Sequence, residues 1–332
     1  MAEESLPGKA LVLGSGAARG VAHVGVINAL EDHNLRPDMV VGTSMGAVVG
    51  AAYAAGRLPE LSEFMQSLDW RSIITYCDFS FPQQGLLDGA YIMNQLKELV
   101  GDIQFSDLEI PFYAVATDMK SGEPVIFREG SVIVALRASL SVPGIFKPAQ
   151  LNDHWYLDGG IVAPLPIRQA LELGAENIIA VDLNHHQIQR NSRPRRIKGF
   201  DRKDILKSDV SLKNNGQDAS PSLWNHVERR YKTVEQSMRL ALYNMVQSDN
   251  SSNNFPNIFD VLGNSMTIME HNLSKITLEQ FPPDILIQPR LSHLNFFDFD
   301  KAPEAIKTGY HATRDKIKEK PELFSQNESQ SV

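Results

Sequence analysis

The sequence is poor in cysteine, since Cys77 is the single one among 332 residues. One thiol cannot form an intrachain disulfide, and it cannot build a zinc site from several cysteine ligands. A chain with a single cysteine fits a reducing compartment. A chain of this length can still bury roughly three quarters of its unfolded surface, which is enough to support a rigid site.

The sequence also lacks an excess of positive charge and a long hydrophobic run. It has 40 acidic and 32 basic residues, a formal net charge of −8, which argues against a nucleic-acid binder. The longest apolar stretch, residues 47–55, has about half of the ~20 residues that a membrane span needs. Residues 1–7 are acidic and lack the basic-then-apolar order of a signal peptide. We expect a cytoplasmic protein without a transmembrane segment; peripheral contact with the inner face of the membrane stays open, because local patches can oppose the net charge.

A Gly-x-Ser-x-Gly motif stands in a context that favours a serine nucleophile. An apolar run at 39–41 predicts the end of a buried strand, and residues 47–55 predict the helix after it. A sharp turn between strand and helix would expose the serine hydroxyl at a helix N-terminus, where N–H groups favour negative charge. The alternative is an ordinary glycine-flanked turn, since the motif also occurs by chance. The motif comprises Gly42, Thr43, Ser44, Met45 and Gly46.

A loop of small residues precedes this motif, between a strand predicted at 9–13 and a helix predicted at 21–33. It comprises Gly14, Ser15, Gly16, Ala17, Ala18, Arg19 and Gly20. A dinucleotide-binding loop would need its third glycine where Arg19 stands, and a phosphate-binding P-loop would need a closing Gly-Lys-Ser/Thr. Two interpretations remain: a cradle of backbone N–H groups that holds an oxyanion, or a tight turn of small residues.

Two aspartates end predicted strands in the middle of the chain. Asp118 follows the strand predicted at 111–117 and is interpreted as a cap or turn residue, with a supporting role in a site as the alternative. Asp158 follows the short strand predicted at 155–157 and precedes Gly159 and Gly160. Because Asp-Gly is a common turn signal, the residues alone indicate a hairpin position for Asp158.

Predicted strands and helices alternate along the chain, which indicates one α/β domain with a mainly parallel sheet. Residues 58–100 look helical or irregular. Further strands are predicted at 125–127, as part of a hairpin, and at 178–183 and 284–287; further helices are predicted at 131–141, 223–246, 259–278 and 303–320.

The domain assignment follows from changes in composition. We assign a core to residues 1–185 and a basic, mobile insertion to 186–222, where arginine and lysine stand among polar residues. Residues 223–324 are expected to complete the same domain with helices and a last strand, and residues 325–332 to form a disordered tail.

Four ordered motifs in residues 8–185 resemble those of the patatin-like phospholipase family, in particular its compact bacterial members. Three are the loop at 14–20, the motif around Ser44 and the sequence Asp158-Gly159-Gly160; the fourth is Ala138-Ser139-Leu140-Ser141-Val142-Pro143, the family's Ala-Ser-x-x-x-Pro block. Four motifs in order are much more specific than any one of them. One departure stands out, because this chain has Ser15-Gly16-Ala17 where the family commonly has three glycines.

The resemblance implies a three-layer α/β/α fold and a lipid acyl hydrolase with a Ser–Asp dyad. It makes Ser44 the nucleophile and Asp158 the general base, with the loop at 14–20 as the oxyanion hole. The elbow is then formed by Gly42, Thr43, Met45 and Gly46, and Gly159 and Gly160 support the motif of the acid. Neither a metal nor another cofactor is required, and the pKa of Asp158 should be raised by partial burial.

The expected substrate is an acyl lipid, such as a lysophospholipid or a short-chain ester, at or near a membrane surface. Residues 186–280 are the candidate lid or membrane-facing edge, and the sequence leaves oligomerisation open. Two alternatives use the same fold: a regulatory or scaffold protein of low activity, and an acyltransferase that uses the same serine.

A Ser–His–Asp triad on an α/β-hydrolase fold is the closest rival to the dyad. That fold places several strands before its nucleophile, whereas only the strand predicted at 9–13 precedes the one that leads to Ser44. A triad in the order Ser, Asp, His would draw its base from the histidines after Asp158, each of which is more simply a surface or capping residue. These are His185, His186, His226, His271, His293 and His311.

Overall fold

Strands β1 (Lys9–Leu13) and β2 (Met39–Thr43) lie at the centre of the sheet because their side chains are apolar on both faces. They are buried along almost their whole length in the computed structural model, which describes residues 8–68, 89–185 and 258–321. Strands of this kind are typical of parallel sheets that helices cover on both sides. Accordingly, β1 pairs in parallel with β2 on one side and with β7 (Asn177–Val181) on the other.

The described residues form an eight-stranded mixed sheet with the order β5-β6-β3-β2-β1-β7-β8, and β4 pairs with β3 outside this path. The strands from β3 to β8 along this order run parallel, whereas β4, β5 and β6 pair antiparallel near one edge. The mainly parallel sheet predicted from the sequence is therefore confirmed. The strands not yet given are β3 (Phe112–Asp118), β4 (Pro124–Phe127), β5 (Ala149–Leu151), β6 (His154–Asp158) and β8 (Ile285–Ile287).

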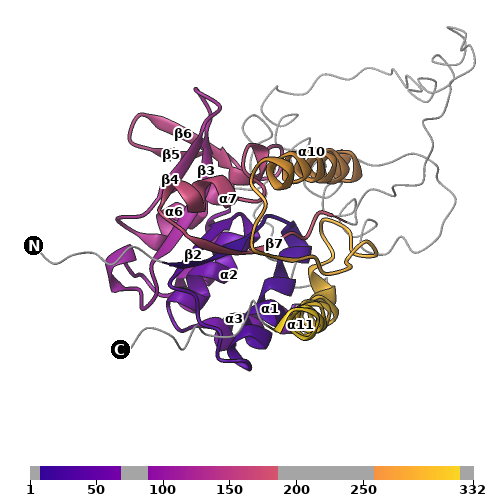
Figure 1. The fold of residues 1–332 in the computed structure, drawn as a ribbon. Coiled ribbons are helices and arrows are strands. Elements are labelled where there is room, and N and C mark those ends of the chain that lie inside the picture. The colour runs from indigo at the N-terminus through magenta and orange to yellow at the C-terminus, as the bar shows by residue number, and fades with distance from the viewer. Residues whose placement is uncertain (1–7, 69–88, 186–257, 322–332) are drawn as a thin grey trace, which may run out of the picture. The chain divides into compact units, whose positions relative to one another are not determined.

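Helices cover both faces of this sheet, which confirms the three-layer α/β/α architecture (Figure 1). Leu11 and Leu13 of β1 face one layer and Ala10 and Val12 face the other, as the alternation of side chains along a strand requires. The first layer contains α1 (Ala22–Glu31), α2 (Met45–Ala54), α3 (Leu58–Ser67), α5 (Ala90–Val100), α6 (Val132–Ser139) and α11 (Ala302–Glu319). The second contains α7 (Ile167–Glu172) and the C-terminal part of α10 (Ile258–Gln280).

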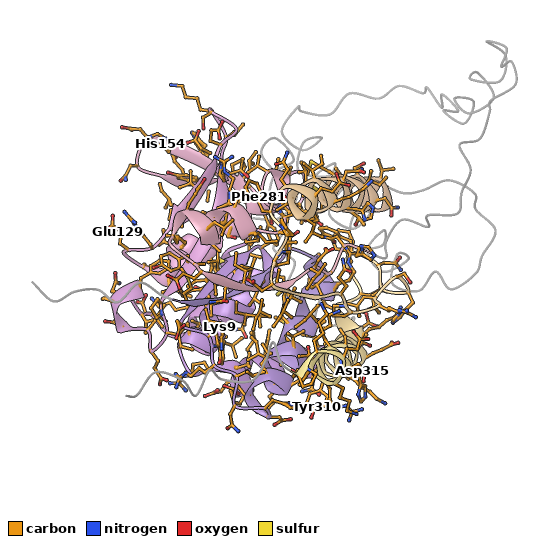
Figure 2. The ribbon with its side chains drawn as sticks, viewed as in Figure 1. Lys9, Glu129, His154, Phe281, Tyr310 and Asp315 are labelled. Atoms are coloured by element: carbon orange, nitrogen blue, oxygen red, sulfur yellow. The ribbon has the colours of Figure 1, made fainter. Side chains whose placement is uncertain are left out.

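Helices α1 and α11 come from opposite ends of the described chain and pack closely against each other. A side chain at Gly25 would meet the main chain of Ile306, and one at Gly309 would meet the carbonyl of Ala22. At the rim of this contact the Tyr310 hydroxyl donates to the Asp32 carboxylate over 2.7 Å, and Figure 2 shows Tyr310 at the outer edge of α11. Glycine at both positions lets the two helix backbones approach within a distance that any larger residue would prevent.

The structure moves several predicted boundaries. The helix predicted at 21–33 is a 3-10 turn, η1 (Ala17–Val21), followed by α1. The hairpin predicted at 125–127 is confirmed by β4, whereas β5 was not predicted. Three other 3-10 turns are η2 (Phe105–Asp107), η3 (Gly159–Ile161) and η4 (Phe299–Lys301).

Several expectations fall on other parts of the chain. The insertion predicted at 186–222, the helix at 223–246 and the tail at 325–332 lie outside the described residues. Among the helices that are described, none is both long and apolar enough to cross a bilayer.

Candidate active site

Ser44 occupies a strained turn at the point where β2 passes into α2. Its φ of 55° and ψ of −123° are unusual for a residue with a side chain, and such strain is typical of functional sites. A side chain at Gly42 would come within 2.5–2.7 Å of the backbone of Gly46 and Ala47, and one at Gly46 would meet the carbonyls of Leu13 and Gly14. The two glycines of the motif are thus required for the elbow to form.

The carboxyl group of Asp158 lies directly against the Ser44 hydroxyl. Ser44 Oγ donates a hydrogen bond to Asp158 Oδ2 over 2.6 Å. The other carboxyl oxygen, Oδ1, accepts from the backbone N–H of Gly160 over 2.7 Å, and this contact fixes the orientation of the group. β6 carries Asp158 to this position because it pairs with β3, where Ala116 lies opposite Asp158. A hairpin position for Asp158, as the residues alone indicated, is wrong, because β6 leads into η3 rather than into a returning strand.

Burial changes the basicity of this carboxyl group. Asp158 is 1% exposed, and desolvation raises its pKa to about 6, although the hydrogen bonds from Ser44 and Gly160 act in the opposite direction. A carboxylate with this pKa is mostly ionised at neutral pH and is a stronger base than an exposed aspartate. The pair can therefore move a proton from the serine to the carboxylate.

The Ala-Ser-x-x-x-Pro block supports both members of the pair. Ser139 Oγ accepts from the backbone N–H of Ser44 over 2.8 Å and donates to the carbonyl of Val115 over 2.6 Å. The carbonyl of Ser141 accepts from the N–H of Asp158 over 2.9 Å. A single short segment thus holds the elbow and the end of β6 in register with each other.

The loop at 14–20 lies beside the elbow, and only part of it is free to bind an anion. Four of its N–H groups donate to main-chain carbonyl oxygens 2.7–3.1 Å away. The donors are the N–H groups of Gly14, Ser15, Ala18 and Arg19. The N–H groups of Gly16 and Ala17 have no acceptor among the described residues, and Ala17 has a φ of 48°. Within the oxyanion loop predicted at 14–20, Gly16 and Ala17 are therefore the candidate N–H donors to a ligand.

Three side chains near the loop are buried, and two of them, those of His23 and Glu270, were not predicted as site residues. His23 is neutral, since burial lowers its pKa to about 4, and its Nε2 lies 2.8 Å from the carbonyl of Gly14. Arg19 was predicted as a loop residue, but its side chain is 1% exposed and its Nη2 donates to Asn184 Oδ1 over 3.2 Å. Glu270 of α10 is 2% exposed. The burial of Glu270 could have been predicted from its spacing in the sequence, because Met266, Glu270 and Ser274 lie four residues apart and share one buried face of α10.

Asp118 is a turn residue, in agreement with the first interpretation of it. Its Oδ1 accepts from the N–H groups of Lys120 and Ser121, over 3.0 and 2.8 Å. The backbone N–H of Ser121 is the main cause that lowers the pKa of Asp118 to about 2, and His154 contributes to it. His154 lies at the outer end of β6 (Figure 2). This cluster is separate from the Ser44–Asp158 pair.

No histidine takes the place of Asp158 beside the serine in the described part of the chain. His271 Nδ1 lies 2.8 Å from the carbonyl of Asn184, and His293 pairs with Glu304 at 2.8 Å. The described residues also contain no group of three or more histidine, cysteine or acidic side chains placed to hold a metal ion.

A cavity of about 890 Å³ lies away from the serine, between α1, α2 and α3. Its lining includes Arg36, Tyr53 and Glu109, and neither Ser44 nor Asp158 belongs to it. The size of this cavity therefore says nothing about the ligand of the Ser44 site.

Sequence comparison identifies the family. The model of the family described as patatin-like phospholipase matches residues 11–171. An uncharacterized NTE family protein of Mycobacterium tuberculosis is 31% identical over 323 residues, which cover 92% of this chain and 90% of that protein. The chain belongs to the patatin-like phospholipase family. The resemblance stated from the four motifs is thereby confirmed.

Other relatives of this patatin-like chain match about half of it. Patatin-like phospholipase domain-containing protein 6 of Homo sapiens is 32% identical over 181 residues, which are 52% of this chain and 13% of that protein. Lysophospholipase NTE1 of Scheffersomyces stipitis is 33% identical over 181 residues, 52% of this chain and 11% of that protein. Among solved structures, VipD from Legionella pneumophila matches with a TM-score of 0.46 and 13% identity, over 95% of this chain and 67% of that one.

Proposed function

We propose that this chain is a lipid acyl hydrolase in which Ser44 is the nucleophile and Asp158 is the general base. The observation that carries the proposal is the hydrogen bond of 2.6 Å from Ser44 Oγ to Asp158 Oδ2. A nucleophile in direct contact with a buried carboxylate needs no third residue to accept its proton. Membership of the patatin-like phospholipase family supports an ester of a lipid as the substrate.

The reaction divides into two balanced steps. First, Ser44 Oγ bonds to the ester carbonyl carbon while its proton moves to Asp158 Oδ2, and the alcohol leaves with that proton when the tetrahedral intermediate collapses. Second, a water molecule gives a proton to Asp158 and attacks the acyl-enzyme, and Ser44 regains its proton as the fatty acid departs. The free N–H groups of Gly16 and Ala17 are the candidate donors to the oxyanion, each worth about 3–4 kcal/mol in comparable sites.

A lysophospholipid is the substrate class that we favour. The fungal relative that matches over 52% of this chain is named a lysophospholipase. The described residues provide no built metal site, and the mechanism does not call for one. This substrate implies that hydrolysis takes place at the surface of a membrane or micelle. The protein would contact that surface from one side.

The test combines covalent labelling with hydrolysis. A fluorophosphonate probe should label the wild type at Ser44, and the wild type should release fatty acid from lysophosphatidylcholine. Ser44→Ala should lose labelling and at least about 1000-fold in kcat/KM, with an unchanged thermal melt, because loss of one hydroxyl opens no core cavity.

Ser67→Ala, which removes an exposed serine of α3, is the matched control and should retain both signals. Labelling without release of fatty acid into water would favour acyl transfer to another acceptor. A wild type that neither labels nor hydrolyses would favour the regulatory or scaffold alternative, and undiminished turnover by Ser44→Ala would overturn the site.

A further inference from the structure

A second buried carboxyl group, that of Glu270, lies beside Asp158 and has no part in the mechanism above. It comes from α10, more than a hundred positions along the chain. The two acids approach each other across Gly160: a side chain built there would lie 2.5 Å from Glu270 Oε1 and 2.9 Å from Asp158 Oδ1. Glycine at 160 therefore leaves room for both carboxyl groups at one point of the site.

Glu270 also contacts the loop that holds the two free N–H groups. The side chain of Ser15 lies near enough to the Glu270 carboxyl to lower its pKa, and Asn184 Nδ2 donates to Ser15 Oγ over 3.4 Å. Ser15 is fully buried, and its Cβ lies 3.3 Å from where a side chain at Gly160 would begin. The departure from glycine at 15 thus places a hydroxyl beside the Glu270 carboxyl of α10.

The charged groups around Glu270 do not offset the effect of burial on its pKa. Burial raises its pKa to about 8; Arg19 of η1 opposes this rise, whereas Asp158 of β6 and Asp182 after β7 add to it. Among the described residues Arg19 forms no ion pair with Glu270, and Glu270 Oε2 is buried without a hydrogen-bond partner. Two more charged or titratable neighbours are Asp298, which faces Arg19, and His271, whose Nδ1 contacts Asn184.

From this geometry we propose that Glu270 is a positioning residue of the site: its neutral carboxyl holds Ser15 and the oxyanion loop in place, and a negative charge on it ends activity at alkaline pH. The proposal rests on the proposed function. A charge on Glu270 would lie beside the loop and beside Asp158, where it would oppose the negative charge that develops on the oxyanion. Ser15 would then donate to a carboxylate instead of accepting from a carboxylic acid, so the loop would change its contacts.

The pH profile of kcat/KM on a soluble p-nitrophenyl ester tests this inference. In the wild type, activity should fall above pH 8 by about tenfold for each further pH unit. Glu270→Gln keeps the size of the side chain but cannot ionise, so its profile should stay within about twofold of its own plateau up to pH 9.5. Its plateau should lie about two- to fivefold below that of the wild type, because an amide replaces the carboxylic acid beside Ser15.

Ser15→Ala gives a second and independent variant. The hydroxyl of Ser15 favours the ionised form of Glu270, so its removal should move the alkaline limit to higher pH. Glu279→Gln, an exposed acid on the same helix, is the matched control and should keep the wild-type limit. An alkaline limit that stays in place in Glu270→Gln, or a wild type without one, would overturn the inference.

Thermal melts provide a readout that does not depend on catalysis. The pKa of Glu270 is near 8 when folded and about 4.3 when unfolded, so the folded state binds the extra proton between these values. Wild-type stability should therefore fall as pH rises from 5 to 8, and Glu270→Gln should gain in melting temperature over the wild type across that range. An equal melting difference at pH 5 and pH 8 would contradict a buried neutral Glu270. If Ser44→Ala stays active, the proposed function fails. The melting temperatures of the wild type and Glu270→Gln still test whether Glu270 is buried and neutral.

Discussion

Residues 8–185 and residues 258–321 contribute to this protein in different ways. The first segment contains Ser44, Asp158 and the loop at 14–20, and it carries all four motifs. The second segment contains no motif, yet it provides β8, α10 and α11 and thereby closes both helical layers. Chemistry in the first segment can be recognised locally, whereas the second acts through packing against partners that are distant in the sequence.

This difference teaches where short patterns are informative. Gly42 is required by the elbow's own backbone, because a side chain there would meet the main chain of Gly46 and Ala47. Gly309, by contrast, is required because of Ala22 on another helix. The residues around Gly309 in the sequence do not predict its contact with Ala22. The predictions below test whether the division between chemistry and packing holds.

Of the changes that follow, Asp158→Asn should have the largest effect, a loss of about 100-fold to 10,000-fold in kcat/KM on a p-nitrophenyl ester. Asparagine can still accept from Gly160 and contact Ser44, but it cannot take up the serine proton. The pKa of Asp158 is raised to about 6 in the folded state, so its ionisation lowers the stability of the fold as pH rises from about 4 to 6. This loss of stability is complete at pH 8. Asp158→Asn should therefore melt at the same or a higher temperature at pH 8. A loss of activity below about tenfold would remove Asp158 from the role of base.

The acid side of the pH profile is the second test of the first segment. Activity requires ionised Asp158, whose pKa is raised to about 6 by burial. We expect kcat/KM to rise with pH through an apparent pKa near 6 and to fall about tenfold per pH unit below it. Measurement on a soluble ester between pH 4 and 8 checks this. A midpoint near 4, the ordinary value for aspartate, would mean that the base is a solvated carboxylate.

Gly309→Ala tests the second segment by its effect on stability alone. Glycine to alanine in an ordinary helix interior stabilises by about 0.5–1 kcal/mol. At Gly309 the new methyl group would collide with the carbonyl of Ala22, so we expect a loss of about 1–3 kcal/mol in the free energy of unfolding. Denaturant melts measure it, and kcat/KM of the folded fraction should be retained.

Lys307→Ala, at an exposed position of the same helix, is the control and should change stability by less than about 0.5 kcal/mol. Equal stability of Gly309→Ala and the wild type would mean that α1 and α11 are not in close contact.

The smallest effects are expected from the histidines after Asp158. His271, His293 and His311 belong to the second segment, and none of them contacts Ser44 or Asp158 among the described residues. Each change to alanine, including those at His185, His186 and His226, should leave at least a tenth of kcat/KM. Loss of activity through one such change, in a variant that stays folded with Ser44 still open to reagents, would replace the dyad with a triad and give the second segment a chemical role.

The loop at 14–20 illustrates how far prediction could reach. Its small residues and its position after a strand predicted a cradle of N–H groups, and Arg19 excluded a dinucleotide site. Which N–H groups stay free depended on carbonyls contributed by Pro164, Val181 and Phe296, which are far away in the sequence. The same limit applies to Asp158: Asp-Gly alone indicated a turn, and the family resemblance was needed to connect it with Ser44.

The sequence by itself determined the α/β class, the family and the elbow at Ser44. The class and the elbow depend on hydrophobic periodicity and on backbone constraints that act over a few neighbouring residues, and the family depends on four short motifs in a fixed order. Only the tertiary structure decided that Ser44 and Asp158 lie 2.6 Å apart, that Ser139 holds the elbow, and that Glu270 is buried beside Gly160. The physical reason is that burial and desolvation are set by which distant elements meet, and a glutamate on an amphipathic helix shows no sign of its environment until the helix is packed.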